Sequence, residues 1–186
     1  MALKATVVKA ELHISDLDRH YYATHTLTLA QHPSETDARL MVRLAAFALF
    51  ADDALSFGRG LSTEDEPDLW RKSLTGEIEQ WIDLGQPDES RIRKACGRAR
   101  EVVVIGYSGR SFTQWWDKQA DALVRCTNLD VLELTGTTVD AMTALFERNM
   151  RLQCLIEDRT LQLIGDGGTV EVSPIWRQQR AAVRGG

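Results

Sequence analysis

Acidic side chains recur at alternate positions of one short segment, "GEIEQWIDLG", which spans residues 76–85. Glycines bound the segment and its charged residues alternate, a pattern typical of a β-strand. Successive strand side chains point to opposite sides, so one face of this strand is expected to hold four residues: Glu77, Glu79, Trp81 and Asp83. If that face is open to water, solvation accounts for its three carboxylates. If it is covered, a cation is needed to compensate their charge.

A second acidic segment, "TEDEPDLW", precedes this strand and supplies Asp68. Mg²⁺ and Mn²⁺ take oxygen ligands, and Mg²⁺ is commonly bound by one or two carboxylates together with waters and substrate phosphates. Acids that converge from two neighbouring elements suit such an ion. We therefore expect a divalent-metal site formed by Asp68, Glu79 and Asp83. Asp65 and Glu66 compete with Asp68 for the place of the ligand from the turn, and the sequence leaves this choice open.

The spacing within the strand constrains the roles of its acids. Glu79 and Asp83 are four residues apart, and strand positions on one face at that separation lie roughly 13 Å from each other. Both therefore cannot bind one ion directly, and if Glu79 is a ligand, Asp83 is expected to hold a nearby base instead. A metal at this place would activate water and neutralise a phosphodiester transition state, with Lys94 as the nearest lysine to stabilise charge or assist proton transfer.

Basic side chains follow in the segment "QPDESRIRKACGRAR", whose apolar residues recur at helical spacing. The segment carries five bases: Arg91, Arg93, Lys94, Arg98 and Arg100. Arginine pairs bidentately with phosphate groups, so Arg91 and Arg98, with Arg59 between two glycines, are predicted to bind nucleic acid. The alternative is a solvated helix whose bases pair with the nearby acids Asp88 and Glu89.

The composition is that of one soluble globular domain over residues 1–186. The chain has 22 Lys and Arg against 27 Asp and Glu, a net charge of −5, which argues against coating nucleic acid through bulk charge. It contains no apolar run of the roughly 20 residues that a membrane span needs and no signal-peptide pattern at its start. We therefore expect a cytoplasmic protein without membrane contact. The three cysteines are far apart in sequence and are expected to be small core residues.

Periodicity predicts alternating strands and helices around these segments. The first part of the chain is expected to form an N-terminal hairpin over 3–14 and 22–30, a helix that starts at a Ser34–Asp37 capping box and ends near 50, and a short strand within 55–62. A helical turn after Pro67 and the strand at 76–85 follow. The middle of the chain is expected to alternate: a helix over 87–100, a strand at 101–107, a helix at 111–126, a strand near 129–135 and a helix behind Thr137. The chain is expected to close with hairpins that turn at 157–158 and 165–168. This order predicts an α/β fold whose mixed central sheet is flanked by helices.

The chain as a whole resembles the YaeQ family of small bacterial proteins. The resemblance rests on the following segments, which occur here in the family's order: "MALKAT", "HPSET", "RGL", "DEP", "WIDLG", "PDE" and "RIRKAC". The YaeQ fold resembles that of the PD-(D/E)XK nucleases, and this likeness implies an αβββαβ core here with added hairpins. Only two of the first three strands of such a core are evident in the sequence.

The resemblance also implies where a nuclease motif would fall. Pro67 and Asp68 match its Pro-Asp pair, whereas the acid-x-lysine element would lie on the strand at 76–85, which has no lysine at the matching positions. Lys94 would then act from the following helix, or catalysis is absent and only the fold survives. The leading hypothesis is a divalent-metal-dependent phosphodiesterase or nuclease acting on nucleic acid. The alternative is a non-catalytic module that binds nucleic acid or a protein partner, with Trp115 or Trp116 as an exposed anchor.

Overall fold

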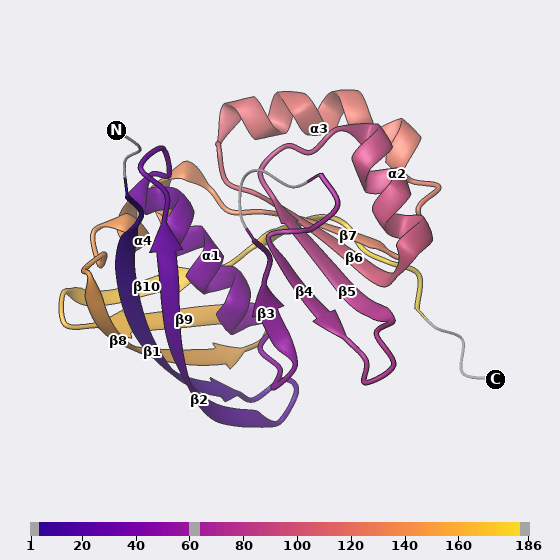
Figure 1. The fold of residues 1–186 in the computed structure, drawn as a ribbon. Helices are drawn as coiled ribbons and strands as arrows, with labels where there is room; N and C mark the ends of the chain where they lie inside the picture. The colour runs from indigo at the N-terminus through magenta and orange to yellow at the C-terminus, as the bar shows by residue number, and fades with distance from the viewer. Residues whose placement is uncertain (1–3, 60–63, 183–186) are drawn as a thin grey trace. The chain divides into compact units, whose positions relative to one another are not determined.

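The computed structural model describes residues 4–59 and 64–182, and the chain forms two compact units (Figure 1). Unit 1 comprises Met1–Ala51 and Gly136–Pro174, and unit 2 comprises Asp52–Thr135 and Ile175–Gly186. Each unit contains its own β-sheet with helices packed on it. The single domain expected over residues 1–186 stays a prediction.

Unit 1 is built on a five-stranded sheet with the order β10-β9-β8-β1-β2. Its strands are β1 (Thr6–Asp16), β2 (Tyr21–Gln31), β8 (Asn149–Glu157), β9 (Thr160–Gly165) and β10 (Gly168–Val172). The predicted N-terminal hairpin is the antiparallel pair β1–β2, and the predicted terminal hairpins are β8–β9 and β9–β10. β1 also pairs in parallel with β8, so segments from both halves of the chain join in one sheet.

Two helices belong to unit 1, α1 (Asp37–Leu49) and α4 (Gly136–Thr143). The capping box expected at Ser34 and Asp37 is wrong, because the N-cap of α1 is Thr36, whose hydroxyl accepts a hydrogen bond from the Arg39 amide at 3.1 Å. The Ser34 hydroxyl is hydrogen-bonded to His32 Nδ1 at 2.6 Å, which removes it from the helix start.

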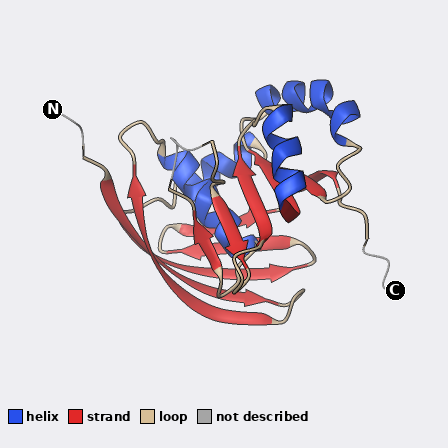
Figure 2. Cartoon of the chain, turned by 45° about the vertical axis from the view of Figure 1, so that its right-hand side comes forward, coloured by secondary structure: helices blue, strands red, loops and turns tan. Residues whose placement is uncertain are grey.

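Unit 2 is built on a six-stranded sheet with the order β11-β7-β6-β5-β4-β3. Its elements are β3 (Leu55–Phe57), β4 (Leu69–Lys72), β5 (Ile78–Leu84), α2 (Glu89–Arg98), β6 (Ala99–Gly106), α3 (Arg110–Leu123), β7 (Leu129–Glu133) and β11 (Ile175–Gln178). β3, β4 and β5 form an antiparallel meander, and β5, β6 and β7 run parallel through the crossovers α2 and α3 (Figure 2). The mixed sheet with flanking helices is as predicted, although there are two such sheets.

β4 is the strand that was not evident in the sequence. The segment after Pro67 is extended and does not form the helical turn expected there. Trp70 on β4 lies opposite Trp81 on β5, and the two rings meet edge to face with their centroids 6.2 Å apart. Such an aromatic cross-strand pair stabilises the antiparallel pairing of β4 with β5. The β-propensity of the β4 residues alone does not reveal this contribution.

The core of unit 2 lies between its sheet and the apolar sides of α2 and α3. Its buried residues come from both helices and from all three parallel strands: Trp81, Ile92, Ala95, Ala99, Val102, Val104, Phe112, Leu123, Leu129 and Val131. Trp81 is therefore on a covered face of β5, with only 2% of its surface exposed. Within the described part of the chain, every helix is too short or too polar to pass through a lipid bilayer.

Gly106, at the end of β6, packs directly under Phe112 of α3. A Cβ atom at this position would lie 1.9 Å from Phe112 Cδ2, and Phe112 is fully buried. Gly106→Ala is therefore expected to destabilise unit 2 by about 1–3 kcal/mol through overpacking. Urea unfolding followed by tryptophan fluorescence measures this, because all five tryptophans lie in unit 2.

Gly97→Ala is the matched control for this prediction. Gly97 lies in α2 with no atom within 4 Å of an added Cβ, so alanine should stabilise the helix by about 0.5–1 kcal/mol. Equal effects of the two substitutions would contradict the packing argument.

Candidate functional site at the ends of the parallel strands

The acidic strand is compensated by a guanidinium group. Asp83, near the end of β5, is 2% exposed and faces Arg91 of α2. Arg91 Nε donates to Asp83 Oδ2 at 2.9 Å, and Nη2 donates to Oδ1 at 2.9 Å. Both carboxylate oxygens are therefore engaged by one planar fork, the bidentate geometry in which arginine binds carboxylates most strongly.

Arg91 also holds the loop that precedes β4. Its Nη1 donates to the Glu64 carbonyl at 2.8 Å, and its Nη2 donates to the Glu66 carbonyl at 2.9 Å. The hydrogen bond from Arg91 to Asp83 raises the pKa of Arg91 above its ordinary value, against the opposing effect of burial. Arg91 is thus a permanent cation that joins α2, β5 and this loop.

Asp68 belongs to the same cluster of charges. Its Oδ2 accepts a hydrogen bond from the Leu84 amide at 2.8 Å, which places the start of β4 against the end of β5. Its charge also contributes, after that of Asp83, to the raised pKa of Arg91. Acids from two neighbouring elements converge here, and Arg91 is the cation that both of them stabilise.

Glu79 does not join Asp68 and Asp83. The register between β4 and β5 shifts: Ile78 lies opposite Lys72 and Gln80 opposite Arg71, so Glu79 is an extra residue in a β-bulge. Ile78 packs against the core around Trp81, whereas Glu79 Oε2 lies 3.2 Å from Arg71 Nε. This contact is an ion pair without hydrogen-bond geometry. The strict alternation expected along this strand is wrong at the bulge.

This arrangement does not fit a metal ion held jointly by Asp68, Glu79 and Asp83. Both oxygens of Asp83 are bonded to Arg91, and Glu79 is paired with Arg71. Across residues 4–59 and 64–182, no three or more His, Cys, Asp or Glu side chains are placed to hold a metal ion together. Asp83 binds the base Arg91, whereas the sequence led us to expect such a base at Asp83 only if Glu79 were a metal ligand.

The remaining predicted residues surround the acidic loop. Lys94 Nζ lies 3.2 Å from Asp65 Oδ1, with 60% and 80% of the two side chains exposed. Arg59 Nε lies 3.5 Å from Glu66 Oε1. The Arg98 guanidinium lies 5.3 Å from the centre of the Trp81 ring and donates to the Asp65 carbonyl at 3.4 Å. Lys94 is therefore paired at the rim of the cluster and not with Asp83.

Two further bases of this segment form exposed ion pairs. Arg93 is paired with Glu89 at 2.7 Å one turn earlier, as the solvated-helix alternative predicts. Arg100, just beyond the helix, is paired with Glu77 at 2.9 Å. Most acids that neutralise this helix come from other segments, and helical spacing alone does not reveal them.

A polar cluster at the same strand ends was not predicted. The Gln86 side-chain amide donates to the Ser108 and Ser111 hydroxyls at 2.7 and 2.9 Å. Gln86 follows β5, whereas Ser108 follows β6 and Ser111 lies in the first turn of α3. The signal for this cluster is topological: the carboxyl ends of parallel strands meet at one edge, where ligands of α/β sheets commonly bind.

Trp115 and Trp116 are both half-buried. They pack against the core of unit 2, and Trp115 stacks on Phe112 with ring centroids 5.2 Å apart. The structure thus gives both tryptophans a packing role, and the exposed anchor that the non-catalytic alternative includes stays a prediction.

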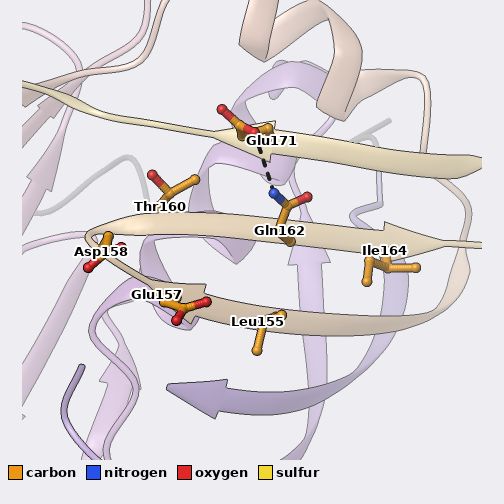
Figure 3. Close-up of a pocket in the computed structure, with 7 residues that line it drawn as sticks. All are labelled: Leu155, Glu157, Asp158, Thr160, Gln162, Ile164 and Glu171. Carbon is orange, nitrogen blue, oxygen red and sulfur yellow. Dashed lines mark hydrogen bonds between the residues drawn. The ribbon is translucent and has the colours of Figure 1, made fainter. Parts of the chain in front are cut away.

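Unit 1 carries a separate pocket of 560 Å³ on its β8–β9–β10 sheet (Figure 3). Acidic, polar and apolar side chains line it: Leu155, Glu157, Asp158, Thr160, Gln162, Ile164 and Glu171. The Gln162 amide donates to Glu171 Oε2 across the strands at 3.4 Å. None of the sequence-predicted site residues lies in this pocket.

Fold and site together define a mixed α/β protein with two mixed sheets and an arginine-bridged acidic cluster at the ends of its parallel strands. The family model described as "YaeQ protein" matches residues 1–174, and the chain belongs to the YaeQ family, as its sequence segments predict. It is 42% identical over 179 residues to the uncharacterized protein YaeQ of Escherichia coli K12, a match that covers 96% of this chain and 99% of the relative.

Solved structures agree with this assignment. The YaeQ protein of Xanthomonas axonopodis pv. citri superposes with a TM-score of 0.91 at 61% identity, covering 94% of this chain and 98% of the other. That of Pseudomonas syringae gives a TM-score of 0.90 at 33% identity, covering 95% and 97%. The two-sheet architecture is therefore shared with both of these relatives.

Removal of Arg91 tests its role as the compensating cation. Arg91→Ala leaves Asp83 buried without a partner, so we expect a loss of about 3–5 kcal/mol in the free energy of unfolding. Arg93→Ala removes an exposed pair from the same helix and should cost only about 0.3–0.5 kcal/mol. Urea unfolding of both variants makes the comparison. Similar losses in the two would show that the Arg91–Asp83 pair does not hold the loop and helix together.

Proposed function

We propose that this chain is a non-catalytic module that binds nucleic acid through the exposed bases of α2 and its C-terminal end. The α2 basic surface consists of Arg93, Lys94, Arg98 and Arg100. One observation carries the proposal: Arg91 is committed to Asp83 inside the fold, while the side chains of Lys94 and Arg100 remain 60% and 68% exposed. Arg91, 27% exposed and bonded to Asp83, is thus distinct from the bases of this segment that are largely exposed.

The ion pairs on this surface can be exchanged for phosphate groups at little cost. Lys94 is paired with Asp65, and Arg100 with Glu77, with both members of each pair largely exposed. Such pairs are worth about 0–1 kcal/mol. Phosphate contacts also release condensed counterions from the nucleic acid, which favours binding at low salt. Arg59, 84% exposed at the edge of the acidic loop, extends the same surface.

We further propose that unit 2 keeps the core of the PD-(D/E)XK nucleases without their metal chemistry. The β3–β4–β5 meander, the crossover α2 and the parallel strand β6 support this proposal, as does the place of Asp68 after Pro67 and beside the end of β5. Two departures favour loss of catalysis. The acidic strand has no lysine, and Asp83 is bonded to Arg91 through both oxygens.

Charge reversal tests the binding proposal. The double variant Lys94→Glu and Arg98→Glu should weaken binding to labelled single- and double-stranded oligonucleotides, measured by fluorescence anisotropy at about 50–200 mM salt. We expect the slope of log affinity against log salt to become shallower by roughly 0.7–0.9 for each phosphate group that the variant no longer neutralises. No divalent metal should be required.

The matched control places the same charge change on unit 1. Lys9 and Arg148 are exposed there, so Lys9→Glu with Arg148→Glu alters the net charge equally and leaves the α2 basic surface intact. Equal weakening by both double variants would mean that net charge governs binding and that α2 is not the binding surface. No binding by the wild type at low salt would reject the proposal.

A metal-dependent phosphodiesterase is the second candidate, and the convergence of Asp68 with Asp83 favours it. It requires Arg91 to release Asp83. Calorimetric titration of Mn²⁺ into the wild type and into Asp68→Asn distinguishes the candidates, together with an assay for metal-dependent cleavage of oligonucleotides. The binding module predicts no cleavage by either protein. Saturable one-site binding and cleavage that are both abolished in Asp68→Asn would establish the phosphodiesterase instead.

A further inference from the structure

β2 is a long edge strand that carries no charge. It is the outermost strand of the unit 1 sheet, next to β1 (Figure 1), and its 11 residues include no Asp, Glu, Lys, Arg or Pro. Its register with β1 is continuous, without a bulge. Native proteins commonly shorten an edge strand, bulge it, or place charges or proline on it, because its free backbone groups can pair with another chain. β2 has none of these protections.

The other sheet edges are protected by their length or charge. β10, at the opposite edge of the unit 1 sheet, has 5 residues and carries Glu171. In unit 2 the edge strands are β3, with 3 residues, and β11, with 4 residues that include Arg177. Among the strands of the described residues, β2 is therefore the one long edge.

The ladder hydrogen bonds show which backbone groups line the free edge of β2. The Lys9 amide donates to the Arg148 carbonyl just before β8 at 2.8 Å. Because successive strand residues direct their backbone groups to alternate sides, the even-numbered residues of β1 bond to β2. They lie opposite odd-numbered residues of β2, as Leu12 lies opposite His25. The even-numbered residues of β2 therefore direct their backbone groups to the free edge: Tyr22, Thr24, Thr26, Thr28 and Ala30.

The side chains of the same five residues lie on the exposed face of the sheet. Three of them are threonines, whose β-branched side chains favour an extended strand. Tyr22 is 60% exposed, and Val7 of β1, which lies opposite Ala30, is 58% exposed. A large apolar side chain is thus left uncovered near each end of β2.

We propose that two copies of this chain associate through their β2 edges, which pair antiparallel about a two-fold axis at Thr26. The register that pairs β2 along its full length sets Thr26 opposite Thr26 of the second copy. Thr24 then lies opposite Thr28, and Tyr22 opposite Ala30. Each of these pairs exchanges two hydrogen bonds, because these residues direct their backbone groups to the free edge. The proposal concerns unit 1 alone and does not rest on the nucleic-acid-binding proposal.

The self-complementarity of the edge identifies the partner as a second copy. Tyr22 of one copy meets Ala30 of the other, whose small side chain lets the ring lie over it toward Val7 on the next strand, about 4.8 Å further. The two-fold axis makes this contact twice, so both exposed apolar side chains of each copy are covered. Since β2 has no charged residue, its pairing with itself sets no like charges opposite each other.

Charge substitutions at the axis test the proposal. Sedimentation equilibrium of the full-length protein should show a dimer and give its Kd. Thr26→Lys and Thr26→Glu each set two like charges directly opposite each other, so each should raise the Kd about tenfold or more. An equimolar mixture of the two variants should recover the wild-type affinity, because the heterodimer has opposite charges at the axis.

Gln153→Lys is the matched control. It adds the same charge to an exposed position of β8 opposite His13 of β1, away from the free edge, so its Kd should equal that of the wild type. Circular dichroism compares the folding of all variants, and the exposed position of Thr26 predicts that both substitutions there leave unit 1 folded.

Three outcomes would overturn the proposal. One is a wild-type protein that remains monomeric at its highest soluble concentration, which would leave the β2 edge to a strand of a different protein. Another is a dimer whose Kd is the same in the wild type and in both folded Thr26 variants. The third is a mixture of these variants that associates no more tightly than either variant alone.

Discussion

The bidentate pair between Arg91 and Asp83 is the interaction on which the arrangement of unit 2 depends. Burial of the Asp83 carboxylate would be costly without a partner, and Arg91 supplies two hydrogen bonds to it and two to the loop before β4. One side chain thereby joins the end of β5, the crossover helix and the loop. The guanidinium group of Arg91 supplies positive charge at the place where the sequence predicted a metal ion.

Most of the fold follows from periodicity in the sequence. The N-terminal hairpin, α2 and the apolar strand β6 have patterns long enough to be identified alone. β4 and β11 were missed because a four-residue strand is too short to show alternation in the sequence. Such strands are held by contacts with neighbouring strands, such as the contact between Trp70 on β4 and Trp81 on β5. Two separate sheets instead of one could not be inferred, since local patterns do not specify that β1 pairs with β8.

Of the three predicted metal ligands, the structure brings Asp68 and Asp83 near each other, because neighbouring strands bring their ends together. Glu79 is separated from them by the β-bulge. The shift of Glu79 to the Arg71 side depends on a single extra residue in the β4–β5 register, which no periodicity reveals. The sequence did not predict which acid each base of α2 would pair with, Asp83 with Arg91 and Asp65 with Lys94, because Asp65 lies in the loop before β4. Nor did it predict the contact between Gln86 and Ser108, which arises because β5 and β6 run parallel.

The parallel pairing of β1 with β8 has a consequence for synthesis on the ribosome. Lys9 pairs with Asn149, 140 positions later, and most of unit 2 lies between them. Because the chain emerges from its N-terminus, the β1–β2 hairpin is made early and then waits with an unpaired β1 edge while residues 52–135 are translated. Completion of unit 1 is thus a late step with long-range contacts, the kind that forms slowly. A ribosome that stalls before β8 leaves a nascent chain with an open strand edge that other chains, or a chaperone, can occupy.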